Sequence, residues 1–250
     1  MYHSIPHSGD STDYFAVPCA TFAAQLDLLQ SLGMTGLSLE RMLERGARNG
    51  SRPAVAITFD DGYADNYTEA FPALATRGMS ATVFVITSRI GTTGYLTWAQ
   101  LREMKAGGIS IQSHTHTHPF LSAISRAAAR AELETSRQVL DQMLSQRTTT
   151  VALPNGDAPR RWRRKDFSAA GFRWVATSAH GANAAPEWRV RRYTVRRGTT
   201  LAQLEQIVRL LPSAWSREGL RLTVLGFVRS LLGVSRYARW RRRILSRVEG

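Results

Sequence analysis

The stretch that decides the fold is AVAITFDDGY, residues 54–63. Its first six residues are almost wholly apolar and are followed directly by Asp60, Asp61 and Gly62. A short apolar run of this kind is typical of a strand that is buried on both faces, as the strands of a parallel sheet are. The pattern therefore predicts a central strand over residues 54–59 with two carboxylates at its C-terminal end.

Helical and strand-like segments alternate on both sides of this strand. We predict helices over residues 21–32, 65–76, 97–106, 122–144, 161–170 and 201–211, and further strands over residues 81–86, 108–112, 149–153, 173–177 and 190–195. Alternation of buried strands with helices is typical of parallel β-α units. The predicted fold class is α/β, a distorted parallel (β/α)7-type barrel, in which functional residues gather at the C-terminal ends of the strands.

The length and composition favour one domain followed by a segment of different character. The chain has 250 residues, of which 43% are hydrophobic and 21% charged, close to the averages of soluble globular proteins. We predict one domain over residues 1–211 and a basic amphipathic helical tail over residues 212–250, where leucine and phenylalanine are mixed with arginine. No apolar stretch approaches the roughly 18 residues that a membrane-spanning helix needs.

The formal net charge is +14, and all but two of the basic residues are arginines. Basic surfaces attract phosphates, anionic lipids and acidic glycans alike, so the charge by itself selects no partner. The tail is compatible with a helix in peripheral contact with an anionic membrane and equally with a helix packed on the barrel. No nucleic-acid partner is expected, because the basic runs carry no recognisable binding motif.

Cys19 is the only cysteine, so no internal disulfide can form and no Cys-x-x-Cys pair exists. We therefore expect any metal to be bound by histidine, aspartate or glutamate. The N-terminus shows neither the basic start nor the apolar run of a signal peptide, which leaves a cytoplasmic or peripheral membrane location open. A buried first strand would ordinarily have several apolar residues before Tyr2, so we expect that the start of the chain is shortened or misassigned.

Two polar clusters carry the candidate chemistry. The first is the pair Asp60 and Asp61, which is costly to keep ionised beside a core unless a metal or a proton offsets the repulsion. The second is SHTHTHP, residues 113–119, in which His114 and His118 can converge if the segment turns. His116 would point away from both in an extended segment and is left out of the site.

Together the two clusters supply one carboxylate and two imidazoles as ligands, an open position for water and a spare carboxylate, which is the composition of a hydrolytic metal site. The alternatives are an Asp-Asp-Gly turn that caps a helix and a histidine cluster on the surface.

These motifs, in this order and about fifty residues apart, resemble those of the polysaccharide deacetylase family, also called the NodB-homology or carbohydrate esterase family 4 group. The resemblance runs from Tyr2 to about Arg197 and includes the stretches 58–62, 70–72, 81–84, 103–104, 114–115 and 118–119 together with Trp98. It implies that Asp60 is the general base. It also implies that Asp61, His114 and His118 bind one divalent metal ion, which in similar proteins is usually zinc.

The chain departs from the family pattern in the segment that supplies the oxyanion donor. The family draws a backbone N–H from a Pro-Tyr-Gly-like segment, and the corresponding residues here are Pro154, Asn155 and Gly156. A backbone donor survives a change of side chain, so Asn155 is the candidate donor, Pro154 preserves the turn and Tyr63 is a further substrate contact. The alternative for Asn155 is a turn without a catalytic role. Ala152 stands where many relatives have an arginine, so Asp60 needs another group to tune it.

A second departure concerns the general acid that protonates the leaving amine. Relatives often use a late histidine, but no histidine follows His180. In some relatives a Tyr-His strand at the N-terminus supplies the acid, and Tyr2-His3 resembles that arrangement, so His3 is assigned as the acid. The alternative is that His3 only packs near the site. His7 and His180 are lesser candidates, each interpreted as a loop residue.

The resemblance thus implies a metal-dependent deacetylase that hydrolyses the N-acetyl group of an amino sugar, with an N-acetylated polysaccharide, oligosaccharide or glycolipid as substrate. Two alternatives stay open. One is a degenerate glycan-binding protein of the same fold without turnover, which the missing late histidine and Ala152 favour. The other is a metal-dependent hydrolase of another non-peptide C–N bond.

Overall fold

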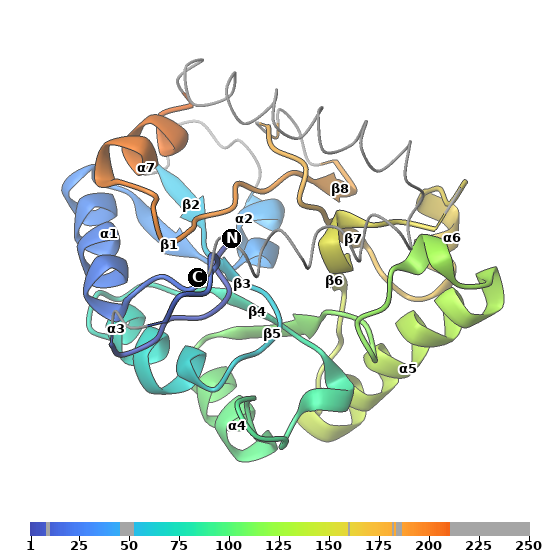
Figure 1. The fold of residues 1–250 in the computed structure, drawn as a ribbon. Coiled ribbons are helices and arrows are strands. Elements are labelled where there is room, and N and C mark those ends of the chain that lie inside the picture. The colour runs from blue at the N-terminus through green and yellow to red at the C-terminus, as the bar shows by residue number, and fades with distance from the viewer. Residues whose placement is uncertain (9–10, 46–52, 160, 182, 184–186, 211–250) are drawn as a thin grey trace.

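Parallel strands form the centre of the molecule and helices surround them (Figure 1). The structure is a computed structural model that describes residues 1–250 except 9–10, 46–52, 160, 182, 184–186 and 211–250. In this part of the chain, a six-stranded sheet has the order β3-β4-β5-β6-β7-β8, so neighbouring strands are also successive in the sequence. The predicted α/β fold class is confirmed as a parallel sheet that curls toward a barrel. The predicted tail, residues 212–250, lies outside the described residues.

All pairs within the six-stranded sheet are parallel, as the alternation of strands and helices predicted. A separate pair of parallel strands, β1 and β2, lies before it in the sequence. The strands are β1 (Thr35–Leu37), β2 (Ala54–Ala56), β3 (Thr58–Phe59), β4 (Thr82–Val85), β5 (Ser110–Ser113), β6 (Thr150–Ala152), β7 (Trp174–Ala176) and β8 (Arg189–Val190).

The α-helices are α1 (Cys19–Ser31), α2 (Leu39–Arg45), α3 (Phe71–Ala75), α4 (Trp98–Ala106), α5 (Arg126–Leu144), α6 (Arg164–Ala169) and α7 (Leu201–Val208). One π-helix, η1 (Asn66–Ala70), precedes α3, and short 3-10 turns form η2 (Thr87–Arg89), η3 (Leu121–Ala123) and η4 (Pro154–Gly156). Local sequence explains several starts. Thr97 and Gln100 form a reciprocal capping box at α4, and the Ser125 side chain accepts a hydrogen bond from the Ala128 N–H at the start of α5.

The strand predicted over residues 54–59 is wrong in one respect, because it divides between two sheets. Residues 54–56 pair with β1, whereas Thr58 and Phe59 pair with β4. The other edge of β3 is taken by Tyr2, whose N–H donates to the Thr58 carbonyl at 2.8 Å and whose carbonyl accepts from the Asp60 N–H at 3.0 Å. Since that edge is occupied, β1 cannot extend its pairing from β2 along β3.

The N-terminal segment also reaches the other edge of the curled sheet. The Met1 nitrogen donates to the Tyr193 carbonyl at 2.8 Å, and the Val195 N–H donates to the Met1 carbonyl at 2.9 Å. Residues 1–2 therefore connect β3 to the segment that follows β8, and these bonds bring residues 192–195 close to the C-terminal end of β3. The strand predicted over residues 190–195 is shorter than expected, because it leaves β7 after Val190 to make these contacts.

Buried aromatic and aliphatic side chains fill the space between the sheet and helices α1, α3 and α4. This core includes Tyr2, Phe22, Phe59, Leu101 and Met104, all less than 5% exposed. The packing of this core positions β3 and β5, the strands that Asp60 and His114 follow. In the part of the chain described, no helix has both the length and the apolar character needed to cross a bilayer. The tail that we expect to contact a membrane lies outside the described residues.

Candidate metal centre

The two polar clusters lie at the same edge of the sheet. Asp60 and Asp61 follow β3, while His114 follows β5 directly, and β4 lies between these two strands. Because the strands are parallel, their C-terminal ends face the same side of the molecule. The fold thus brings together segments that are more than fifty residues apart in the chain.

Asp61, His114 and His118 converge on one point. The Asp61 Oδ1 atom is 3.3 Å from His114 Nε2 and 3.4 Å from His118 Nε2. Ligand atoms around a tetrahedral zinc ion are separated by about 3.3 Å when each lies about 2.0–2.1 Å from the metal. The three side chains therefore fit a divalent ion of the zinc class, and both Asp61 and His118 are only partly buried, so the centre faces solvent.

The loops reach this geometry through unfavourable backbone conformations. Asp61, Thr115 and His118 have φ values of 74°, 67° and 61°, in the left-handed region that non-glycine residues rarely occupy. Such residues cost on the order of 1–3 kcal/mol each and cluster at functional sites. The turn at Thr115 and His118 also explains why the two histidines converge, which an extended segment would prevent. Strain at these residues supports a functional role for the loops.

A glutamate on α5 holds the histidine loop in place. Glu132 Oε2 accepts hydrogen bonds from the N–H groups of His116 and Thr117 at 2.9 and 2.7 Å, and its Oε1 accepts from the Thr117 hydroxyl at 2.6 Å. The Thr115 hydroxyl accepts from the His118 N–H at 3.1 Å. His116 is not part of this cluster, although the segment is not extended as the prediction for His116 assumed, and its Nδ1 is hydrogen-bonded to the Thr87 hydroxyl at 2.9 Å.

The protonation of the two histidine ligands is set by their surroundings. His114 Nδ1 donates to the Ala152 carbonyl at 2.9 Å, which leaves Nε2 directed at Asp61. Burial lowers the pKa of His114, but the charges of Asp60 and Asp61 outweigh burial and raise it. Burial and the neighbouring His114 lower the pKa of His118 to about 4. His118 is therefore neutral near neutral pH, the form that binds metals.

Asp60 has a partner that the sequence reasoning missed. The Arg192 guanidinium donates to both carboxylate oxygens, at 2.6 Å to Oδ1 and 2.8 Å to Oδ2, and the two residues are 6% and 3% exposed. Burial raises the pKa of Asp60, but the charges of Arg192 and His114 outweigh it and lower the pKa overall. Arg192 thus supplies the positive charge that Ala152 cannot. Its only sequence signal is an arginine within a strand predicted to be buried, where a charge needs a partner.

His3 lies near both aspartates, and their charges raise its pKa while the larger effect of burial lowers it. Its ring packs on Phe15 with the centroids 4.6 Å apart, and its buried Nδ1 has no hydrogen-bond partner among the described residues. The other two histidines considered make different contacts. His7 is exposed and pairs with Glu69, and the His180 ring packs on Tyr193 with the centroids 4.4 Å apart.

The candidate oxyanion and substrate residues lie on two loops. Asn155 is exposed with a φ of 55°, and it follows Pro154 after β6, the strand whose Ala152 carbonyl contacts His114. Tyr63 packs on Tyr95 with the ring centroids 5.3 Å apart. Burial and the charge of Asp61 raise the pKa of Tyr63, so its hydroxyl keeps its proton and can donate a hydrogen bond.

The comparisons with known sequences all point to one protein family. The sequence model described as polysaccharide deacetylase matches residues 47–175. The chain is 37% identical over 188 residues to YxkH of Bacillus subtilis, a candidate polysaccharide deacetylase, covering 73% of this chain and 64% of that protein. It is 34% identical over 139 residues to the chitooligosaccharide deacetylase of Sinorhizobium fredii, covering 55% and 58%. The chain thus spans less than two thirds of the length of these relatives.

The fold also matches solved structures. The Streptococcus pyogenes deacetylase PplD, solved in complex with acetate, superimposes with a TM-score of 0.73 at 27% sequence identity. The match covers 83% of this chain and 96% of PplD. The described fold of this chain is therefore similar to the fold of nearly the whole PplD chain.

Proposed function

The chain belongs to the polysaccharide deacetylase family, and from this premise we propose that it is a metal-dependent hydrolase that removes the acetyl group from an N-acetylated amino sugar in a polysaccharide, oligosaccharide or glycolipid. The observation that carries the proposal is the convergence of Asp61, His114 and His118 beside the buried, ionised Asp60. The relatives named as a chitooligosaccharide deacetylase and a deacetylase solved with acetate support this reaction class.

In this proposal Asp61, His114 and His118 hold one divalent ion, for which zinc is the best fit to two imidazoles and a carboxylate. Such an ion, when bound, lowers the pKa of water and polarises a carbonyl group. The hydrogen bond from His114 Nδ1 to the Ala152 carbonyl keeps Nε2 free for this role. The remaining steps belong to residues of the chain itself.

Asp60 is the proposed general base, which accepts a proton at a carboxylate oxygen from the attacking water. Its bidentate contact with Arg192 keeps it ionised in a buried position. A carboxylate held in this way is a weak base, so proton transfer to it is favourable only from a water whose acidity is raised. The proposed role of Asp60 as a base therefore depends on the metal ion that Asp61, His114 and His118 would hold, because that ion would raise the acidity of the water.

His3 is the proposed general acid, which delivers a proton to the leaving amine nitrogen. Because burial lowers its pKa, the ring is neutral at rest and has to gain that proton within the site. The charges of Asp60 and Asp61 act in the direction that favours this gain. The backbone N–H of Asn155 and the Tyr63 hydroxyl are the proposed donors to the oxyanion and the substrate. Ala152 and the missing late histidine are the departures that favour a binding protein without turnover. In this proposal Arg192 takes the place of the missing arginine and His3 that of the missing histidine.

The proposal is tested by acetate release from N-acetylglucosamine oligomers, with and without added zinc. Asp60→Ala should abolish release and retain zinc, because it removes the base and none of the ligands, whereas His114→Ala should lose both. His116→Ala is the matched control, since His116 belongs to the same loop but bonds to Thr87. Equal loss of zinc in the Asp60 and His114 variants would show that their roles are misassigned. Release from a formylated or cyclic amide alone would instead support the other class of C–N hydrolase.

A further inference from the structure

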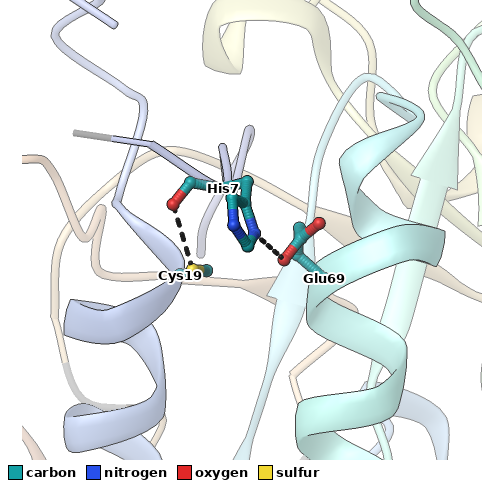
Figure 2. Close-up of side chains that lie close together, drawn as sticks. All are labelled: His7, Cys19 and Glu69. Atoms are coloured by element: carbon teal, nitrogen blue, oxygen red, sulfur yellow. Dashed lines mark hydrogen bonds and ion pairs between the residues drawn. The ribbon is translucent and has the colours of Figure 1, made fainter. Parts of the chain in front are cut away.

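Three potential metal ligands from three separate segments meet away from the candidate metal centre (Figure 2). His7 belongs to the N-terminal segment, Cys19 is the first residue of α1, and Glu69 lies on the π-helix η1. His7 Nδ1 is 3.2 Å from Glu69 Oε2, and the Cys19 thiol donates to the His7 carbonyl oxygen at 3.2 Å. One ligand atom from each side chain lies within 4.8 Å of the other two.

The separation of His7 Nδ1 and Glu69 Oε2 is close to that of two ligands in a zinc site. A thiolate sulfur lies about 2.3 Å from zinc and an imidazole nitrogen or carboxylate oxygen about 2.0–2.2 Å, so ligand atoms are about 3.3–3.6 Å apart. The pair of His7 and Glu69 already meets this spacing, and the Cys19 sulfur, which lies within 4.8 Å of both, would have to move closer to share an ion with them. The sequence led us to expect only histidine and carboxylate ligands, because a single cysteine forms no paired motif. The fold instead brings His7 and Glu69 close to this single cysteine.

The backbone holds these segments together without a metal. The Cys19 N–H donates to the Pro6 carbonyl at 2.9 Å, and the Val17 N–H donates to the Ser4 carbonyl at 3.0 Å. Cys19 also begins a 13-residue helix, whose positive end favours an anionic ligand at this position. Because the two chain segments are already paired, little further ordering is needed to close a site. The exposed side of His7 leaves room for solvent as a fourth ligand.

We propose that His7, Cys19 and Glu69 form a second divalent-metal site, of the zinc class, that fastens the N-terminal segment to α1 and η1. The segment it fastens carries His3, whose carbonyl accepts a hydrogen bond from Asn66 on η1 at 2.8 Å. The site shares no residue with the candidate metal centre. Its role is to hold the segment on which His3 lies, and it does not depend on the proposed reaction.

Cobalt(II) binding to the full chain tests the site, because a thiolate ligand gives cobalt a charge-transfer absorption band in the near ultraviolet. Cys19 is the only cysteine, so this band cannot arise from Asp61, His114 and His118. Metal-free, reduced protein titrated with Co²⁺ should develop the band and reach saturation at one equivalent in the His114→Ala variant. Zinc should then displace the cobalt and abolish the band.

The variants separate a built site from a cysteine that binds metal alone. Cys19→Ser should abolish the band, and His7→Ala and Glu69→Gln should each weaken cobalt binding by roughly tenfold or more. Glu103→Gln is the matched control, because Glu103 is also hydrogen-bonded on the surface, to the Tyr67 hydroxyl. Absence of the band, or a band unaffected by the His7 and Glu69 substitutions, would overturn the proposal. A parallel measurement on the wild-type chain, in which zinc slows reaction of Cys19 with a thiol reagent, covers the case of a variant that fails to fold.

Discussion

Asp60 carries a buried carboxylate whose charge is balanced by an arginine 132 positions later in the chain. Removal of one partner from a buried ion pair typically costs about 3–5 kcal/mol, because the remaining charge is left without compensation. Asp60 can avoid part of that cost by becoming protonated. Because folding lowers the pKa of Asp60, its ionisation stabilises the folded protein at pH values above 3.8, the pKa of an aspartate in the unfolded chain. This contribution is lost as the pH falls through the lower pKa that Asp60 has in the folded protein.

Arg192→Met should therefore raise the pKa of Asp60 and shift the acid limb of the pH dependence of kcat/KM to higher pH. The physical reason is that the variant keeps the burial of Asp60 but loses the main charge that lowers its pKa. The measurement is kcat/KM for deacetylation over the acid and neutral range. Arg77→Met is the control, because Arg77 pairs with the exposed Asp27 on α1 and not with Asp60. An acid limb that stays in place would mean that Asp60 is not the base.

The proposed role of His3 as the general acid is tested with two substrates whose leaving groups differ in their need for a proton. His3→Gln should lower kcat for an N-acetylated glycan by about 10²–10⁴-fold, the usual contribution of a general acid. Hydrolysis of an activated aryl acetate should change much less, because its leaving group departs without a proton. His116→Gln, which alters a histidine hydrogen-bonded to Thr87, provides the comparison. Equal losses on both substrates would assign His3 a packing role instead.

The element that positions the histidine ligands is α5, through Glu132. Glu132→Ala removes the acceptor of three hydrogen bonds from the loop that carries His118. We expect zinc affinity to fall about 10–100-fold, as it does when groups that orient a metal ligand are lost. Competition with a chelator of known affinity measures this. Glu134→Ala, on the same helix and paired with Arg130 at 3.5 Å, should change zinc affinity little, and a similar loss in both variants would contradict the prediction.

At the scale of elements, sequence periodicity predicted the strands and helices that fill the barrel but not the places where strands change partners. The apolar run of residues 54–59 reads as one strand, yet Tyr2 occupies the edge of β3 and confines β1 to β2. The strand β1 spans three residues, too few for a periodic pattern to be recognised. The aspartates were predictable because they follow an apolar run directly, and the histidines because they follow the next but one predicted strand. Arg192 was not, because its pairing with Asp60 depends on how the sheet curls.

At the scale of the whole molecule, residues 1–2 connect β3, at one edge of the six-stranded sheet, to the segment that follows β8, at the other edge. Tyr2 anchors this connection, with its ring 5.1 Å from Phe22 and 5.6 Å from Phe59 between centroids and its hydroxyl donating to Gln25 Oε1 at 3.0 Å. Tyr2→Ala should lower the free energy of unfolding by about 3–5 kcal/mol, as loss of a large buried aromatic ring does.

Tyr2→Phe is the matched variant for this prediction, because it keeps the ring and removes only the hydrogen bond to the buried Gln25 side chain. We expect it to cost about 1–3 kcal/mol, since Gln25 is left without that partner. Urea denaturation of the two variants measures both effects, and acetate release should fall further in Tyr2→Ala because His3 follows directly in the chain. If the two variants unfold at the same urea concentration, the ring does not hold the sheet closed, and the positions of His3 and Arg192 beside Asp60 must be set by the later strands alone.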